Sequence, residues 1–318
     1  MGYRNEVGCG KDIPIRRGGM RMLPSRNRDE RPWSVDLGDH GQLRHARPRD
    51  IVAASRLMER GALLYDERGQ EPTLSLLSAP SIVWHRDGEL CGAMLLSLYR
   101  QPVVALRSVI VAAPDLAPML GQSVLPAIHA HLAELGMTWI ATYGPADWLR
   151  HALAEAGHRC HCEVIGYAKK GFDHAEMGNE QVKVRNAYGG DVDTILAIDL
   201  AAFEPFWWLN RAILRRASRA SDYFLLAELA GRSVGYFMAD RMGAGAYVGR
   251  IAVLPEAQGQ RIGASLMHRA LQLMARDGLQ GVSLNTQRRN TRSQALYGRF
   301  DFVPTGEAQR VWSFDLGK

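Results

Sequence analysis

Long hydrophobic runs and cysteines are both scarce in this chain of 318 residues. No uninterrupted apolar stretch approaches the ~20 residues of a membrane-spanning helix, and the N-terminus lacks the apolar core of a signal peptide. The four cysteines are too few, in a chain of this length, for the disulfide framework of a small secreted domain. We therefore expect a cytoplasmic protein with no membrane partner.

The excess of one sign of charge is also small. Lysines and arginines outnumber aspartates and glutamates by only 39 to 33, which gives a net charge of +6. Arginines cluster near the N-terminus and in residues 211–219 and 288–299, but they are scattered among acidic residues. This balance does not indicate nucleic acid as a partner, whereas arginines around 288–299 suit a phosphate-rich ligand.

Two common nucleotide-binding motifs are missing from the segment that otherwise best suits phosphate. A strand-like run, 247–254, ends in a loop with Gly259 and Gly263, and an amphipathic segment with helical spacing follows. The loop matches neither the P-loop pattern nor the dinucleotide-binding glycine pattern. Unpaired amides at a helix N-terminus, with Arg261 beside them, nevertheless predict pyrophosphate binding. A plain glycine-containing turn is the alternative.

The spacing within this loop narrows the choice of ligand. The run Gln258-Gly-Gln-Arg-Ile-Gly-Ala264 resembles the acyl-CoA pyrophosphate loop of the GNAT N-acetyltransferases, Gln/Arg-x-x-Gly-x-Gly/Ala, with Arg261 replacing the usual first glycine. The resemblance implies acetyl-CoA as co-substrate and no metal. It also implies a cofactor site formed by the loop and by the strand before it: Ile251, Val253, Gln258, Gly259, Gln260, Arg261, Ile262, Gly263 and Ala264.

A second segment of the same family pattern follows at the expected distance. Residues 290–302 resemble the GNAT segment Asn-x-x-Ser/Ala-x-x-Leu-Tyr-x-x-x-Gly-Phe, with Asp301 in place of the glycine. Aspartate tolerates the left-handed conformation of a helix C-cap, so this departure is mild. The resemblance implies that Asn290 contacts the CoA arm and that the Tyr297 hydroxyl serves the leaving thiolate. Taken alone, Tyr297 would be a core aromatic residue.

The first half of the chain repeats this order of elements. Residues 109–125 align without gaps on 250–266, but Pro118 stands at the position of Gly259 and Gln122 at that of Gly263. Proline supplies no amide and glutamine would crowd a diphosphate. Leu153 falls on Tyr297, so the first copy is predicted to be degenerate.

These patterns predict an α/β (α+β) protein with two tandem GNAT-like domains. Each should be a mixed, mostly antiparallel twisted sheet flanked by helices. We expect a poorly ordered extension over 1–44, the degenerate first copy over 45–172, a polar linker over 173–183 and the N-acetyltransferase domain, the second copy, over 184–318.

The acceptor side is less well defined by the sequence. Aromatic residues at 203 and 206–208 surround Glu204, which is the best-placed acid; they form either an acceptor pocket or a helix-packing corner. Ribosomal-protein acetyltransferases of the family carry glutamate where this chain has Asn285, which cannot act as a base. A water relay held by Asn285, Glu204 or backbone carbonyls is the remaining route for the acceptor proton.

One further cluster, the segment from His158 to Cys162, contains four residues of metal-ligand type. On a strand, Cys160 and Cys162 face one side and His161 the other, so they cannot converge on one ion. We expect no metal site here.

The predicted function is transfer of an acetyl group from acetyl-CoA to a primary amine by direct attack. The partner is an amine-bearing acceptor, either a small molecule or a peptide N-terminus, and a homodimer stays open. A non-catalytic acyl-CoA-binding sensor or regulatory protein is the alternative. Asn285 favours the sensor, whereas Tyr297 favours the enzyme, since a pure binder needs no leaving-group acid.

Overall fold

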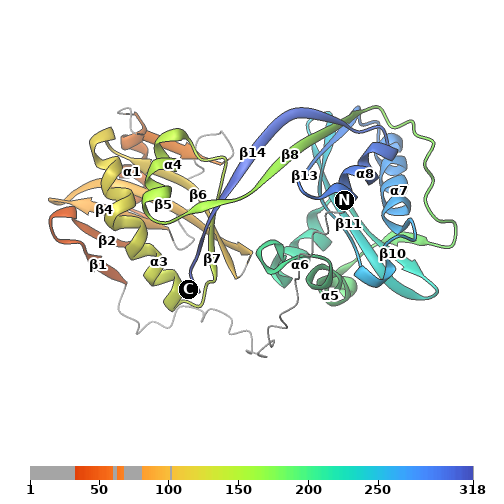
Figure 1. The fold of residues 1–318 in the computed structure, drawn as a ribbon, viewed down its shortest axis with the longest axis horizontal. Coiled ribbons are helices and arrows are strands. Elements are labelled where there is room, and N and C mark those ends of the chain that lie inside the picture. The colour runs from red at the N-terminus through yellow and green to blue at the C-terminus, as the bar shows by residue number, and fades with distance from the viewer. Residues whose placement is uncertain (1–32, 60–62, 68–80, 101, 318) are drawn as a thin grey trace, which may run out of the picture. The chain divides into compact units, whose positions relative to one another are not determined.

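The computed structural model describes residues 33–317 except 60–62, 68–80 and 101 (Figure 1). The chain from Trp33 onwards forms one compact unit. Residues 1–32 of the expected N-terminal extension lie outside the described residues. Its remaining part contains strand β1, Ser34–Asp36, and leads into strand β2, Gln42–His45.

The elements of the two copies follow the order that the repeat predicts. In the first they are α1 (Asp50–Glu59), β3 (Leu63–Asp66), β4 (Ile82–Arg86), β5 (Glu89–Arg100), β6 (Val103–Val111), α2 (Ala117–Met119), α3 (Leu125–Glu134), β7 (Trp139–Tyr143), α4 (Asp147–Glu155) and β8 (Arg159–Lys170). In the second they are β9 (Lys183–Asn186), α5 (Val192–Ala202), α6 (Arg211–Ala220), β10 (Tyr223–Leu229), β11 (Arg232–Met242), β12 (Gly245–Val253), α7 (Ile262–Arg276), β13 (Gly281–Gln287), α8 (Thr291–Arg299) and β14 (Val303–Asp315).

The strands join into one mixed, mostly antiparallel sheet, which confirms the predicted fold class. Their order is β1-β2-β4-β5-β6-β7-β14-β8-β13-β12-β11-β10-β9, with β3 paired to β6 off this path. Two pairs, β6–β7 and β12–β13, are parallel, and the others recorded are antiparallel. Each copy therefore has one parallel pair, which lies at the end of its own strands next to the two long strands β14 and β8.

Two long strands are exchanged between the copies. Strand β8 ends the first copy, yet its residues 164–170 pair with β13 of the second. Strand β14 ends the chain, yet its residues 311–315 pair with β7 of the first copy. The two strands also pair with each other, and Figure 1 shows them running side by side. Each copy thus completes the sheet of the other, an arrangement that the repeat alone does not predict.

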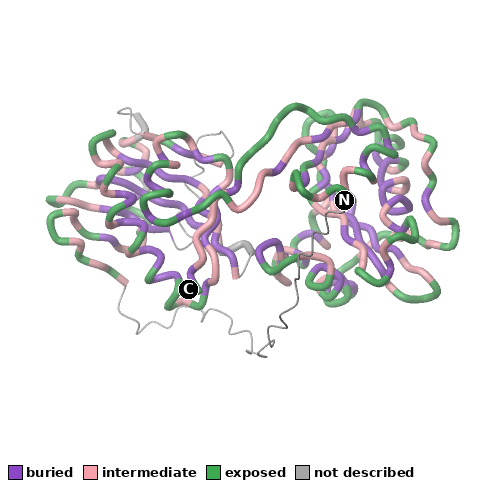
Figure 2. The backbone as a smooth tube through the Cα atoms, in the orientation of Figure 1, coloured by how far each residue is buried: buried purple, intermediate pink, exposed green. Residues whose placement is uncertain are grey.

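Burial explains why β14 reaches the first copy. Its first eight residues, from Val303 to Arg310, are exposed, as Figure 2 shows for the crossing part of the strand. Val311 is then fully buried, and Trp312, Phe314 and Leu316 join the core of the first copy. Because apolar side chains gain free energy when they leave water, this apolar end stabilises the exchange.

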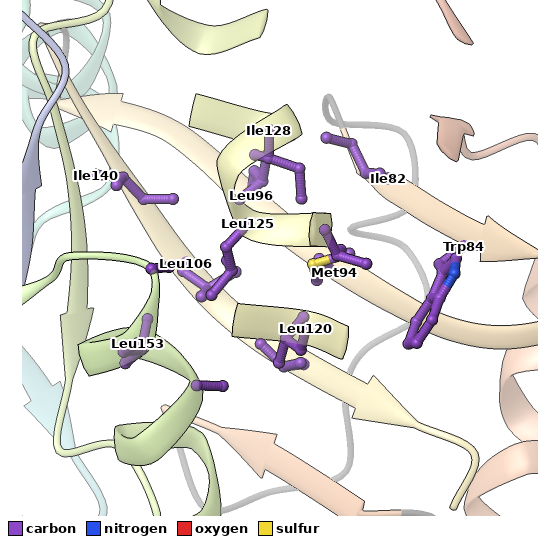
Figure 3. Close-up of a cluster of buried hydrophobic side chains, with 14 of the residues drawn as sticks. Ile82, Trp84, Met94, Leu96, Leu106, Leu120, Leu125, Ile128, Ile140 and Leu153 are labelled. Carbon is purple, nitrogen blue, oxygen red and sulfur yellow. The ribbon is translucent and has the colours of Figure 1, made fainter. Parts of the chain in front are cut away.

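Separate cores stabilise the two copies. The first-copy core lies between its sheet and helices α3 and α4, and Figure 3 shows Trp84, Met94, Leu106, Leu125 and Leu153 among its buried side chains. In the second copy, α7 packs one row of side chains against the sheet: Leu266, Met267, Ala270, Leu271 and Met274. Helices α5 and α6 contribute to a further core with residues of β10, β11 and β12. These cores hold β12 and α7 where the candidate site lies.

Candidate active site

Strand β12 separates from its parallel neighbour part-way along its length. Its pairing with β13 covers Ala246 to Val248 and then stops, while its pairing with β11 continues to Val253. The register with β11 shifts beside Gly249, so this residue is the extra one of a β-bulge. Within the described part of the chain, the β12 edge beyond Val248 has no strand partner on the β13 side. It is free to bind an extended ligand.

The helix N-terminus beyond β12 has the form of an anion site. Helix α7 begins after Arg261, which has a left-handed φ of 59°, and no side chain caps this end. The first-turn amides are therefore directed at the loop without a side-chain acceptor. A left-handed conformation costs a non-glycine residue about 1 kcal/mol or more, which explains why the family pattern favours glycine here.

A cavity of about 970 Å³ lies against this loop and the open edge of β12. All the predicted cofactor residues except Gln260 line it: Ile251, Val253, Gln258, Gly259, Arg261, Ile262, Gly263, Ala264 and Asn290. Arg289, Arg292 and Arg299 add three more cations to its wall. A Cβ at Gly263 would lie 3.3 Å from Leu296 Cδ2, so the wall has little room for a larger residue. These groups fit the pyrophosphate and arm of an acyl-CoA.

The predicted linker packs directly on the loop. Glu176 forms an ion pair with Arg261, and the pKa of its carboxyl is lowered by that guanidinium. Asn179 donates from Nδ2 to the Gln260 carbonyl at 3.0 Å, and its backbone N–H donates to Ser265 Oγ at 2.8 Å. The linker therefore holds the loop in shape, a role that polarity alone did not indicate.

Helix α8 holds two further predicted residues, Asn290 at its N-cap and Tyr297 within the helix. Asn290 Oδ1 accepts a hydrogen bond from the Ser293 N–H at 3.1 Å, so this side chain caps the helix as well as lining the cavity. Tyr297 is 4% exposed, and burial raises the pKa of its hydroxyl to about 12. The phenol therefore keeps its proton at neutral pH.

A second cavity, of about 1040 Å³, shares part of its wall with the first. Phe203, Ile251, Asn290 and Ser293 line both cavities. Tyr297 and Asn285 line the second cavity. Its far wall comes from the first copy and the exchanged strands: Glu67, Leu95, Leu96, Ser97, Val103, Ala105, Arg107, Tyr143, Val164 and Gln309. The two cavities therefore adjoin at these four shared residues.

The aromatic segment between α5 and α6 contains both buried and cavity-lining residues. Phe206 and Trp207 are buried against Val103, Val164 and other side chains of the first copy and β14, as a packing corner would be. Phe203 instead lines both cavities, and Trp207 also borders the second. Phe206 is thus a packing residue, whereas Phe203 and Trp207 both pack and line a cavity; an acceptor pocket here stays a prediction.

A buried ionic network holds this segment on β12. Asp199 is 0% exposed and accepts hydrogen bonds from Tyr236 Oη at 2.5 Å and Arg250 Nε at 2.9 Å. Arg250 also donates to the Trp207 carbonyl at 2.5 Å, and its guanidinium lies 3.6 Å from the Phe203 ring centroid. Sequence reasoning missed this network, although an arginine inside the apolar run 247–254 was a signal for a buried partner.

Glu204 lies apart from the two cavities. Its side chain is 66% exposed and its Oε2 lies 3.1 Å from Arg289 Nη2. Among the described lining residues of either cavity it does not occur, whereas Asn285 does. The proposed catalytic role of Glu204 stays a prediction.

Among the described residues of the first copy, strand β3 occupies the strand edge that matches the open edge of β12. Strand β6 pairs with β7 over Val103 to Ala105 and then separates, as β12 does from β13. Residues 108–111 pair with β5 on one edge and with β3 on the other. The edge that is open in the second copy is thus already occupied by the protein's own backbone.

Comparison with known proteins places this geometry in a family. The profile of the acetyltransferase (GNAT) family matches residues 193–302. A Bacillus subtilis protein named as a [ribosomal protein bS18]-alanine N-acetyltransferase is 27% identical over 123 residues, which are 39% of this chain and 82% of that protein. The second copy is therefore similar to the GNAT acetyltransferase family, and this similarity supports acyl transfer.

Solved GNAT structures match across both copies. A GCN5-related N-acetyltransferase from Sphaerobacter thermophilus has a TM-score of 0.58 at 16% identity, covering 88% of this chain and 97% of its own. A tandem GNAT protein from the clavulanic acid biosynthesis pathway has a TM-score of 0.55 at 14% identity, covering 91% and 99%. At these identities the likeness shows the fold, and it extends over the whole tandem arrangement.

The described residues lack two features, a cluster of metal ligands and a membrane-spanning helix. No group of three or more histidine, cysteine, aspartate or glutamate side chains there is placed to hold a metal ion. No helix in the same part of the chain has the length and apolar character needed to cross a membrane. Of the segment from His158 to Cys162, the residues from Arg159 onwards lie on β8, where His161 stacks on Phe206 with ring centroids 4.0 Å apart.

Proposed function

We propose that this GNAT protein is an N-acetyltransferase that moves an acetyl group from acetyl-CoA to a primary amine by direct transfer. The observation that carries the proposal is the junction of the two cavities. The unpaired edge of β12 borders the first cavity, and Tyr297 lines the second. Ile251 and Asn290 line both cavities.

The first cavity, which is the proposed donor cavity, is suited to acetyl-CoA. Acetyl-CoA supplies the acetyl group as a thioester of a good leaving thiol. The first-turn amides of α7 and the side chain of Arg261 would hold the diphosphate. The free backbone edge at Ile251 and Val253 would bind the extended arm and polarise the thioester carbonyl. Glu176 and Asn179 keep the loop in the required shape.

Tyr297 would hold the proton that the departing thiolate needs. Its raised pKa keeps the hydroxyl protonated, and helix α8 fixes the ring beside Tyr167 and Phe302 at centroid distances of 5.8 and 5.9 Å. A fixed donor of this kind acts without reorganising at the moment of transfer.

The acceptor must lose a proton before it attacks, because only a free amine is nucleophilic. Asn285 lines the second cavity, which is the proposed acceptor cavity, and provides an amide, so we propose a water relay there. Glu204 lies outside the described lining of that cavity and would have to be reached through the relay. The acceptor itself is a small amine or a peptide N-terminus. The name of the Bacillus subtilis relative supports the peptide.

The test is release of free CoA from acetyl-CoA with a panel of small amines and peptides, with the acetylated product identified by mass spectrometry. We expect turnover with at least one primary amine and none with its N-methylated quaternary counterpart. A protein that binds acetyl-CoA tightly but acetylates nothing in the panel would be a sensor instead. The open acceptor cavity beside Tyr297 argues for the enzyme.

A further inference from the structure

The charge of the acceptor cavity is unusual for a site that binds a cation. The charged residues lining it are Arg107, Arg216, Arg250 and Glu67, so three cations face one anion. Arg250 is neutralised by Asp199, which lies behind the cavity wall. An amine without other charges would meet an excess of positive potential here, and like charges in a confined site repel.

Two of these four residues come from the degenerate first copy, and its backbone positions both. The register between β5 and β6 jumps from the pair Leu95–Ser108 to the pair Leu96–Leu106, so Arg107 is the extra residue of a β-bulge. Bulges redirect a side chain and recur beside binding sites. The bulge of β12 in the second copy lies one residue further along by the offset of the repeat, and its extra residue is Gly249, which has no side chain to redirect.

The acid that pairs with Arg107 is Glu67, which lies directly after strand β3. Glu67 follows the last residue of β3, and its backbone N–H donates to the Arg107 carbonyl at 2.9 Å. Its Oε2 lies 3.0 Å from Arg107 Nε, with the two side chains 19% and 31% exposed respectively. The structure records no hydrogen bond from the terminal nitrogens of Arg107 to another described residue. Glu67 therefore orients the guanidinium from one side.

We propose that Arg107 binds an anionic group of the acceptor, so that the substrates are amines that also carry a carboxylate or phosphate. The inference rests on the proposed function. A guanidinium offers parallel N–H donors that match the paired oxygens of either group. Held at Arg107 by its anionic end, the acceptor directs its amine across the cavity toward Tyr297. In this proposal the degenerate first copy binds the acceptor in place of a cofactor.

The test compares amines that differ only in the anionic group. The probes are glycine and glycinamide, β-alanine and its amide, an alanine-terminated dipeptide and its C-terminal amide, and phosphoethanolamine with ethanolamine. Steady-state kinetics at saturating acetyl-CoA give kcat and KM for each. We expect the anionic member of at least one pair to have the higher kcat/KM. The amino-acid and peptide pairs test a carboxylate, and the phosphoethanolamine pair tests a phosphate.

Substitution of Arg107 then assigns the preference to this side chain. Arg107→Gln should raise KM for the anionic member by about 10- to 100-fold, since a charge-assisted hydrogen bond is lost. Its kcat, its KM for acetyl-CoA and the KM of the neutral member should change little. Glu67→Gln should lower KM for the anionic member by about two- to fivefold, because a competing carboxylate is removed.

A matched control excludes a general loss of charge in the first copy. Arg86 lies at the end of β4, pairs with Asp87 at 3.7 Å, and is outside the described lining of both cavities. Arg86→Gln should leave every constant unchanged. An equal effect of Arg86→Gln and Arg107→Gln, or an Arg107→Gln loss shared by both members of each pair, would overturn the inference.

The outcomes for the inference and for the proposed function are separable. If neutral amines are acetylated with the same kcat/KM as the anionic ones, the proposed acetyltransferase function stands and the proposed role of Arg107 is wrong. If no amine is acetylated, the proposed function fails, and calorimetric binding of the same pairs to the CoA complex decides the inference. Equal binding of both members in every pair would reject it.

Discussion

The two copies share a strand order and a bulge, yet they differ in what lies on one strand edge. In the second copy the edge of β12 beyond Val248 borders a cavity of about 970 Å³. In the first copy the matching edge of β6 is paired with β3. A ligand arm that would add itself to the sheet therefore has a free edge in only one of the copies. A paired strand closes this edge to a ligand arm whatever residues the neighbouring loop carries.

The loop beyond the bulge differs in the same way. In the second copy, Gly259 has a φ of 83° and α7 starts only at Ile262, which leaves an open turn at the helix N-terminus. In the first copy, helical structure begins already at Ala117 and continues through a short π-helical segment, Leu120–Val124, into α3. A Cβ at Gly121 would lie 2.7 Å from the Ala152 carbonyl oxygen of α4, so the space is closed by packing.

The largest expected effect comes from placing the same new charge in each copy. Gly263→Glu should weaken acetyl-CoA binding by at least ~100-fold, because a carboxylate would face the diphosphate and its Cβ would crowd Leu296. The rise in Tm that acetyl-CoA gives the wild-type protein should disappear. Differential scanning fluorimetry with and without acetyl-CoA measures both states.

Gln122→Glu is the matched variant, since Gln122 aligns with Gly263 and is exposed. It should keep the full Tm shift, and calorimetric titration of the wild-type protein should find one acetyl-CoA per chain. Two sites per chain, or a smaller shift in Gln122→Glu, would mean that the first copy is not degenerate.

The next effect concerns Tyr297, whose counterpart in the first copy is Leu153. Tyr297→Phe removes only the hydroxyl, so kcat should fall by about 10²–10⁴-fold with acetyl-CoA affinity nearly unchanged. Rapid-quench or steady-state kinetics with the best acceptor gives the ratio. Tyr167→Phe, which removes a neighbouring hydroxyl that donates to Gln294 Oε1 at 3.4 Å, is the control and should retain activity. A kcat of Tyr297→Phe within twofold of the wild-type value would mean that Tyr297 only packs in the core.

A smaller effect tests the strand exchange. Phe314→Ala should lower the free energy of unfolding by about 3 kcal/mol, because the side chain packs in the core of the first copy. Val303→Ala, on the exposed part of the same strand, should change it by less than ~0.5 kcal/mol. Urea denaturation measures both. Hydrogen exchange should rise at β7 in Phe314→Ala, and an increase confined to the second copy would contradict the exchanged position of β14.

The smallest effect is a pH dependence from two buried histidines of the first copy. His129 and His158 lie 3.0 Å apart at Nε2, both near Phe314, and burial lowers their pKa values to about 4 and about 3. The unfolded chain binds protons near pH 6.5 while the folded chain does not, so stability is present above that pH and falls below it.

Unfolding free energies at pH 7.5 and 5.5 measure this effect. The two histidines together should reduce stability at the lower pH by about 2–3 kcal/mol. The double variant His129→Gln, His158→Gln should lose that part of the pH dependence. The same slope in the double variant would show that other groups cause it.

Local sequence was sufficient for much of the second copy. Gly259, Gly263 and the helical spacing after them predict the loop and α7, because a turn and an amphipathic helix are encoded by neighbouring residues. The spacing from this loop to Asn290 and Tyr297 predicted residues that the structure places on the walls of the two cavities. The substitutions Pro118 and Gln122 likewise predicted the loss of a cradle in the first copy.

Only the tertiary structure decided which strands are neighbours and what their edges contact. The amino-acid pattern of β14 indicates an apolar end but not the sheet that buries it, and the pattern of β3 does not show that it fills a cleft beside β6. The same holds for Arg250 with Asp199 and for Arg107 with Glu67, whose partners are distant in sequence. Helices and turns are set by contacts within a few residues, whereas strand pairing and buried ion pairs depend on chain segments that meet only on folding.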